Sequence, residues 1–120
     1  MPLAHFWQRV ADMMMTTIKF ILPGKRRVEI LQALGRYKKS TEIAGGCIRC
    51  HITRDVNKRN TIHYWEEWRT RQDLEKHINS SNYRQLLEII ELSAQKPEIK
   101  FLTIAKTEGL EVVETARIAK

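Results

Sequence analysis

The chain has 120 residues, with 42% hydrophobic and 29% charged side chains and a net charge of +7, a composition typical of one globular domain with its own core. No apolar run approaches the ~20 residues that cross a bilayer, and residues 1–12 lack the layout of a secretory signal, so we expect a cytoplasmic protein without a membrane span. The basic groups come without a groove-reading helix, zinc finger or aromatic-basic strand motif, which argues against a specific nucleic-acid partner. Two interpretations of the positive charge remain: attraction of an anionic small molecule, or a solvated surface with no partner.

Residues 1–12 are predicted to be an N-terminal extension, because their apolar side chains have the spacing of a short amphipathic helix and precede the first strand pattern. Residues 13–120 contain no repeat, low-complexity tract or linker, so they are predicted to form a single domain. Alternating apolar and polar side chains predict strands over residues 14–22, 47–54, 61–68 and 99–106.

Helices are predicted between these strands. The apolar stripe of residues 25–39 repeats with helical period and predicts the first helix. Two short helices follow the third strand: Thr70 is a good N-cap for one, and residues 83–90 contain the apolar series of the other. The composition of residues 110–118 predicts a fifth strand at the C-terminal end of the domain.

This order of elements predicts an α+β fold, a ferredoxin-like antiparallel sheet with helices on one face. The second face is not polar, because both sides of the first and fourth strands carry apolar residues such as Ile21, Leu102 and Ile104. An apolar sheet face of that area indicates a partner, and a symmetric homodimer, sheet against sheet, is the simplest solution. The last strand, separated by Gly109, is a candidate to pair with the other subunit.

The third strand contains a run of aromatic and acidic residues that ends at Trp68. Because side chains alternate along a strand, one face carries Tyr64, Glu66 and Trp68, and the other carries Trp65 and Glu67. One carboxylate therefore faces aromatic surroundings, where it must be paired or have a raised pKa. Two interpretations remain open: a glutamate ion-paired with an arginine beside the core, or a pocket whose aromatic walls hold a planar substrate.

His77 lies on the apolar face of the short helix that follows this strand. A histidine in such a place is either a satisfied core residue or a proton-transfer group. Because residues 79–82 interrupt the helix immediately afterwards, we expect His77 near the mouth of a cavity, where contact with Glu66 is feasible. A histidine and a carboxylate in one pocket are the groups that general acid–base catalysis uses.

Cys47 and Cys50 have the spacing of a redox motif. Residues three apart on a regular strand point to opposite faces, however, so neither a disulfide nor a shared metal is expected between them. Two cysteines are too few for a disulfide scaffold and fit the reducing cytosol. The histidines lack paired helical spacing, so no metal site is expected.

The segment around the third strand resembles the signature of the antibiotic biosynthesis monooxygenase (ABM) domain. In that family an aromatic-Glu-x-aromatic strand precedes a helix ending in histidine, and a further aromatic residue follows. The matching residues are Trp65, Glu66, Trp68, Leu74, His77, Ser80 and Tyr83. The resemblance covers roughly residues 14–106, and it implies a dimeric α+β barrel with a pocket between each sheet and its helices.

The resemblance implies a cofactor-independent monooxygenase that deprotonates an aromatic or quinol-like small molecule, whose carbanion or phenolate passes an electron to dioxygen. Carried over by position, Glu66 and His77 are the candidate catalytic residues. The candidate substrate-binding residues are Trp65, Trp68, Tyr83, His63 and Arg49, the last two on a cationic face that suits an anionic ligand. The alternatives are a non-catalytic ligand-binding or regulatory dimer and a haem-binding member, although the first strand lacks the asparagine of haem-degrading relatives.

Overall fold

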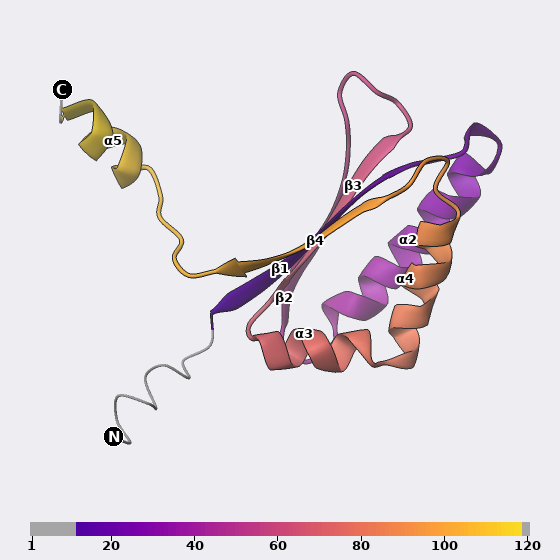
Figure 1. Cartoon of the computed structure of the whole chain (residues 1–120), viewed down its shortest axis with the longest axis horizontal. Coiled ribbons are helices and arrows are strands. Elements are labelled where there is room, and N and C mark those ends of the chain that lie inside the picture. The colour runs from indigo at the N-terminus through magenta and orange to yellow at the C-terminus, as the bar shows by residue number, and fades with distance from the viewer. Residues whose placement is uncertain (1–11, 119–120) are drawn as a thin grey trace.

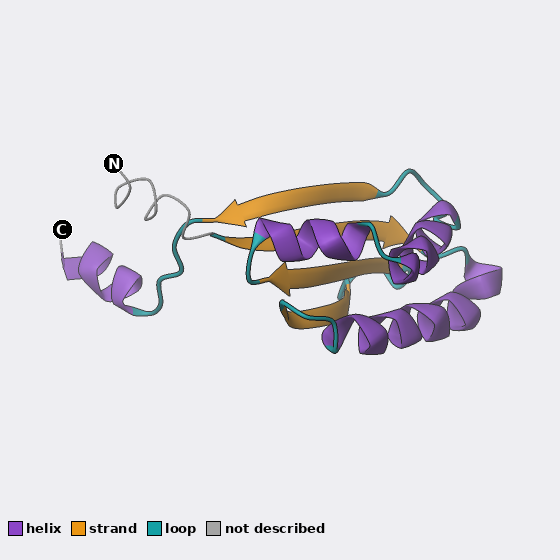
Figure 2. Ribbon diagram, turned by 90° about the horizontal axis from the view of Figure 1, so that it is seen from below, coloured by secondary structure: helices purple, strands orange, loops and turns teal. Residues whose placement is uncertain are grey.

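The computed structural model describes residues 12–118, in which a four-stranded sheet carries helices on one face (Figure 1, Figure 2). In chain order the elements are β1 (Met13–Ile21), the 3-10 helix η1 (Gly24–Arg26), α2 (Arg27–Glu42), β2 (Cys47–Arg54), β3 (Thr61–Trp68), α3 (Arg71–Ile78), α4 (Ser81–Glu91), β4 (Glu98–Ile104) and α5 (Glu111–Ile118). The strand order is β2-β3-β1-β4, and every neighbouring pair is antiparallel. The predicted α+β class and ferredoxin-like sheet are confirmed.

The hydrophobic core lies between the sheet and helices α2 and α4. Burial alternates along β1, where Ile18 and Phe20 face the helices and Lys19 faces the other side. Leu34 of α2 and Leu86 of α4 are fully buried against this face. Removing such side chains from water contributes about 25 cal/mol per Å² of apolar surface, so this layer holds the helices on the sheet.

Hydroxyl caps begin the two short helices that follow β3. The Thr70 side chain accepts a hydrogen bond from the backbone N–H of Asp73 over 3.0 Å, as the sequence predicts. Ser80 accepts one from the backbone N–H of Tyr83 over 3.4 Å. Caps of this kind contribute about 1 kcal/mol each. They turn the chain back beside the end of β3 and so bring α3, with His77, over Trp68.

The C-terminal segment differs from the prediction, because residues 111–118 form the helix α5 and not a strand. Its acidic first turn and Arg117 in its last turn complement the helix dipole, and Leu110 and Val113 have helical spacing. Valines favour a strand only where they pack against neighbouring strands. Figure 1 shows α5 beyond the end of β4 and away from the sheet, so no strand of residues 12–118 lies beside this segment.

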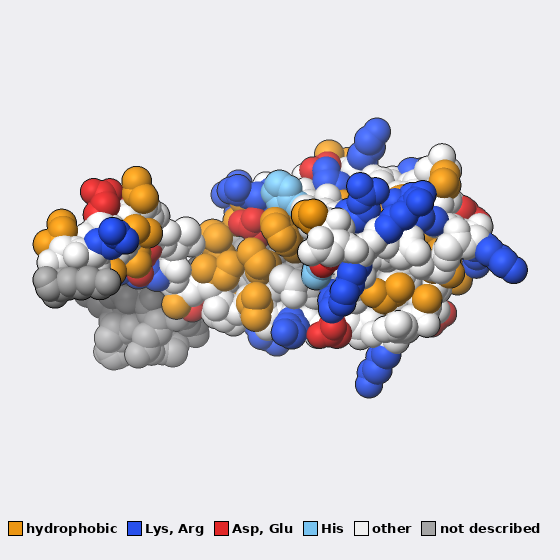
Figure 3. All heavy atoms as spheres, turned by 90° about the horizontal axis from the view of Figure 1, so that it is seen from above, with side chains coloured by type: hydrophobic (Ala, Val, Ile, Leu, Met, Phe, Trp, Pro, Cys, Tyr) orange, Lys and Arg blue, Asp and Glu red, His pale blue; other side chains and the backbone are white. Residues whose placement is uncertain are grey.

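The sheet face opposite the helices is uncovered by any element of residues 12–118. Figure 3 shows hydrophobic side chains gathered over the middle of the molecule, with Lys and Arg side chains around them. The register places Met15 of β1 beside Leu102 of β4 and Thr17 of β1 beside Trp65 of β3. The second face therefore carries apolar side chains, as expected.

Two further expectations concern the N-terminus and the membrane. The predicted helical extension of residues 1–12 lies, apart from Asp12, outside the described residues. No helix between residues 12 and 118 is long and apolar enough to cross a bilayer.

Candidate functional site

The fully buried carboxylate of Glu66 lies among aromatic side chains on the helix-facing side of β3. Its Oε2 accepts hydrogen bonds from the hydroxyl of Tyr64 over 2.8 Å and from that of Tyr37 over 3.0 Å. Its Oε1 accepts one from the indole Nε1–H of Trp68 over 3.0 Å. Alternation along β3 places three of these residues on one face, whereas Tyr37 comes from α2. Hydrogen bonds to a charged group are about twice as strong as neutral ones, so the three donors stabilise a carboxylate here.

His77 of α3 joins this cluster through the hydroxyl of Tyr37. The Tyr37 oxygen lies 2.6 Å from Nε2 of His77, and Nε2 lies 3.7 Å from Oε2 of Glu66, an ion-pair separation without a direct hydrogen bond. Because a carboxylate only accepts, the Tyr37 hydroxyl donates to Glu66 and its oxygen accepts from the Nε2–H of His77. The network therefore assigns the hydrogen of the imidazole to Nε2 and runs from His77 through Tyr37 to Glu66.

Burial and the surrounding polar groups shift the pKa of Glu66 in opposite directions. Burial raises the pKa of its carboxyl, but the nearby His77 ring, together with hydrogen bonds from Trp68 and Tyr64, lowers it by more, so the pKa lies below the ordinary value. Burial and the nearby charge of Glu66 raise the pKa of both Tyr37 and Tyr64. At neutral pH the site thus holds a carboxylate and two protonated phenols that donate to it.

A cavity of about 380 Å³ borders this cluster on the side of α3. Its lining residues are Ser40, Ala44, Gly45, Trp68, Asp73, Lys76, His77, Ser80 and Asn82. The rings of Trp68 and His77 lie 4.6 Å apart, centre to centre, with 32° between their planes, and together form one aromatic wall. Tyr83 packs edge-on against His77, with a centre-to-centre distance of 5.4 Å. The cavity lies within the usual size range of small-molecule sites.

The structure brings together four of the sequence-predicted site residues: Glu66, Trp68, His77 and Tyr83. The other three lie across the sheet. Arg49 is paired with Glu67 on the outer face, its Nε lying 3.4 Å from a carboxylate oxygen. The interpretation of a glutamate ion-paired with an arginine therefore describes Glu67, whereas Glu66 accepts hydrogen bonds from two tyrosine hydroxyls and an indole.

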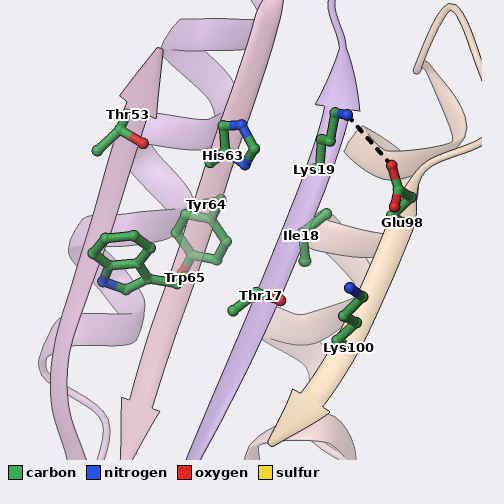
Figure 4. Close-up of a pocket in the computed structure, with 9 residues that line it drawn as sticks. All are labelled: Thr17, Ile18, Lys19, Thr53, His63, Tyr64, Trp65, Glu98 and Lys100. Carbon is green, nitrogen blue, oxygen red and sulfur yellow. Dashed lines mark ion pairs between the residues drawn. The ribbon is translucent and has the colours of Figure 1, made fainter. Parts of the chain in front are cut away.

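The remaining two predicted residues, His63 and Trp65, border a separate cavity of about 480 Å³ on the outer sheet face (Figure 4). Lys19 and Lys100 also line it, and Nζ of Lys19 lies 3.5 Å from a carboxylate oxygen of Glu98. The ring of His51 stands edge-on to Trp65, with centres 5.3 Å apart. The candidate residues thus divide into an inner set around His77 and an outer, basic set around Trp65.

Two members of the inner set do not appear among the sequence candidates: Tyr37 and Tyr64. Tyr64 shares a face with Glu66 by strand alternation, so its position was open to prediction. Tyr37 is one apolar-stripe residue of a helix, and nothing in its local sequence indicates a partner 29 positions away. Within residues 12–118, no group of three or more histidine, cysteine or acidic side chains is arranged to hold a metal ion.

Comparison with known proteins identifies the family. The sequence model of antibiotic biosynthesis monooxygenases matches residues 13–88, more than half of the chain. The chain belongs to the antibiotic biosynthesis monooxygenase family. The match to this ABM model spans β1 through most of α4, and so includes both the inner set and the outer residues of β2 and β3. A search of curated proteins finds no match.

Solved structures share the ABM fold at low identity. A conserved protein from Methanosarcina mazei Go1 has a TM-score of 0.72 and 16% identity, covering 82% of this chain and 98% of that chain. A conserved protein from Bacteroides thetaiotaomicron has a TM-score of 0.71 and 16% identity, covering 78% and 99%. SnoaB from Streptomyces nogalater, a cofactor-independent oxygenase, has a TM-score of 0.70 and 17% identity, covering 81% and 97%. At these identities the likeness establishes the fold alone.

Proposed function

We propose that this chain is a cofactor-independent monooxygenase that binds an aromatic or quinol-like small molecule in the cavity beside His77. One observation carries the proposal: a histidine in the cavity wall is connected through Tyr37 to the buried carboxylate of Glu66. A base backed by buried negative charge is suited to take a proton from a bound substrate. Membership of the ABM family and the oxygenase activity of SnoaB point in the same direction.

His77 is the proton acceptor in this proposal. Because Nε2 carries the hydrogen that faces Tyr37, Nδ1 has the free lone pair that takes a proton from the substrate. The imidazolium that forms is stabilised by Glu66, whose Oε2 lies 3.7 Å from Nε2. The substrate carbanion or phenolate then passes an electron to dioxygen, as the family resemblance implies. The protein binds the substrate, removes its proton and limits the access of water.

The cavity lining supports a planar, phenol-like substrate. Trp68 and His77 form a flat aromatic wall, against which an aromatic ring stacks. Lys76 lines the same cavity and offers a cation to a phenolate oxygen. The amide of Asn82 directs one hydrogen at Thr41 and has a second hydrogen to donate to a substrate oxygen.

Oxygen uptake with reduced quinols and a panel of phenols tests this function. His77→Ala removes the proposed base and Glu66→Gln removes the charge behind it, so each variant is expected to lose roughly a hundredfold or more in turnover. Glu67→Gln is the matched control, because it changes the neighbouring residue of the same strand on the opposite face. Uptake that survives His77→Ala contradicts the assigned base.

A non-catalytic ligand-binding or regulatory protein on the same fold is the second candidate, and one observation favours it. Glu66 is fully buried and does not line the cavity. Its hydrogen-bond network is therefore also consistent with a purely structural role, in which it stabilises the packing of α2 and α3 on β3. For this function we expect phenols to change the fluorescence of Trp68 without any oxygen uptake. The combined fluorescence and uptake measurements separate the two candidates.

We also propose that two copies associate through the outer sheet face. Trp65 contributes a buried indole N–H with no acceptor among residues 12–118, and Leu102 on the same face is 43% exposed. Large apolar side chains and an unpaired donor on one face are typical of a surface that a partner covers. The basic cavity around Lys19 and Lys100 would then lie at the subunit interface.

A further inference from the structure

The two cysteines of the chain lie side by side in β2. The Sγ atoms of Cys47 and Cys50 are 3.6 Å apart, contrary to the expectation that they point to opposite faces. The register explains the difference: Cys47 is opposite Trp68 and Arg49 is opposite Glu67, so the residue between them, Ile48, is an extra residue in β2. A bulge of this kind rotates the preceding side chain, and it places Cys47 on the same inner face as Cys50.

The two thiols differ in access. Cys50 is 2% exposed and belongs to the hydrophobic core, whereas Cys47 is half-buried. Burial raises the pKa of both thiols. Since the thiolate is the reacting form, their oxidation is expected to be slow at neutral pH and faster as the pH rises, with Cys47 reached first.

Both cysteines adjoin the Glu66 cluster. Cys47 is opposite Trp68 in the ladder and packs against the cluster that contains it, and Cys50 is opposite Glu66 and shares the core cluster of Tyr64. A disulfide requires an S–S distance of about 2.05 Å, so closing the present separation moves at least one of the two side chains. That movement changes the packing around Trp68 or Tyr64, each of which donates a hydrogen bond to Glu66.

We propose that Cys47 and Cys50 are a reversible dithiol, which a low-molecular-weight disulfide such as oxidised glutathione converts to an intramolecular disulfide beside the Glu66 cluster. The Cys47 thiolate attacks one glutathione sulfur, the glutathione S–S bond breaks, and one glutathione thiolate leaves. The Cys50 thiolate then attacks Sγ of Cys47 and releases the second glutathione. Two cysteine thiols are oxidised, one glutathione disulfide is reduced, and the two thiol protons end on the two glutathione molecules.

Intact-mass measurement of the folded protein in oxidised glutathione at mildly alkaline pH tests the proposal. The wild type is expected to lose two hydrogen atoms and to keep no adduct. Cys50→Ser is expected to retain one glutathione on Cys47, because the resolving thiol is missing. Cys47→Ser is expected to remain unmodified while folded, because Cys50 is buried, and to react once urea unfolds it.

Trypsin gives a second readout that needs no variant. It cleaves after Arg49, between the cysteines, so the oxidised protein must yield two peptides, residues 40–49 and 50–54, joined through sulfur. Joined peptides that separate on reduction support the proposal. Wild type that keeps both thiols, that carries a stable glutathione adduct, or that forms disulfides only between chains overturns it.

The consequence for the site is measured separately. Oxidation is expected to change the fluorescence of Trp68, recorded in a background with both Trp7→Phe and Trp65→Phe, and reduction is expected to restore it. An effect on oxygen uptake rests on the proposed function, whereas the mass, peptide and fluorescence results do not. Disulfide formation without any change in Trp68 fluorescence would overturn the link to the Glu66 cluster and leave the covalent step standing.

Discussion

The phenolic oxygen of Tyr37 lies 2.6 Å from Nε2 of His77, although the two residues are 40 positions apart in the sequence. Tyr37 belongs to α2 and His77 to α3, and the same oxygen lies 3.0 Å from Glu66 on β3. A single hydroxyl thus connects three elements and links the cavity wall to the buried carboxylate. Its removal is the most selective way to disconnect His77 from that charge.

Tyr37→Phe removes only this hydroxyl and keeps the ring. Glu66 then loses one of its three donors, so we expect the free energy of unfolding to fall by about 1.5–3 kcal/mol, as for hydrogen bonds to charged groups. Urea unfolding measures this change. Tyr83→Phe is the matched control, because the Tyr83 ring packs on His77 without a hydroxyl bond to Glu66. Equal losses in the two variants would contradict the network.

The depressed pKa of Glu66 predicts a pH dependence of stability. Its folded pKa lies below the ordinary value of 4.5, because the His77 interaction and the hydrogen bonds outweigh burial. The unfolded chain therefore binds this proton more readily, and the stabilisation is fully present above about pH 4.5 and is lost as the pH falls through the folded pKa. The stability difference between wild type and Glu66→Gln should shrink in that acid range.

Urea unfolding from neutral pH down to about pH 3 tests this expectation. Exposed carboxyls with lowered pKa, such as Glu29 and Asp55, are present in both proteins and cancel in the difference. Glu67→Gln again serves as the control. A difference that stays constant between neutral and acid pH would rule out the assigned pKa direction.

The outer sheet face predicts the oligomeric state. Light scattering after size exclusion is expected to give a homodimer at micromolar concentration, and Leu102→Glu is expected to shift it toward monomer, because it buries a charge in the proposed interface. Leu87→Glu on α4 is the matched control, since Leu87 is 46% exposed and lies on the helix side. The proposed interface would be contradicted if the wild type were a monomer, or if Leu102→Glu and Leu87→Glu dissociated to the same extent.

Gly46, in the loop before β2, lies against the first turn of α3 and has no room for a side chain. It has a φ of 88°, and a Cβ there would collide with the side chain of Asp73 in the first turn of α3. We expect Gly46→Ala to lower the free energy of unfolding by about 1–3 kcal/mol. Gly45→Ala, whose Cβ meets no atom within 4 Å, should change it little. Thermal unfolding of the two variants makes the comparison, and similar melting temperatures would contradict the assigned clash.

Only part of the candidate site could be predicted from the sequence. Alternation along β3 was sufficient to place Glu66 and Trp68 on one face, and the interrupted helix α3 correctly put His77 beside a cavity. The same alternation sends Trp65 to the opposite face, so the family signature spans two surfaces and not one pocket. Tyr37 had no local signal, because a tyrosine in an apolar helical stripe looks the same whether or not it meets a carboxylate.

Periodic features of this chain were predictable because backbone geometry repeats: two residues along a strand and 3.6 along a helix decide which side chains share a face. The four strands, α2 to α4 and the ferredoxin-like order follow from that local rule. Contacts between elements have no period. The packing of α2 and α3 on the sheet set the Tyr37–His77 distance, and the bulge at Ile48 brought Cys47 to Cys50. Residues 111–118, beside which no strand of residues 12–118 lies, are helical.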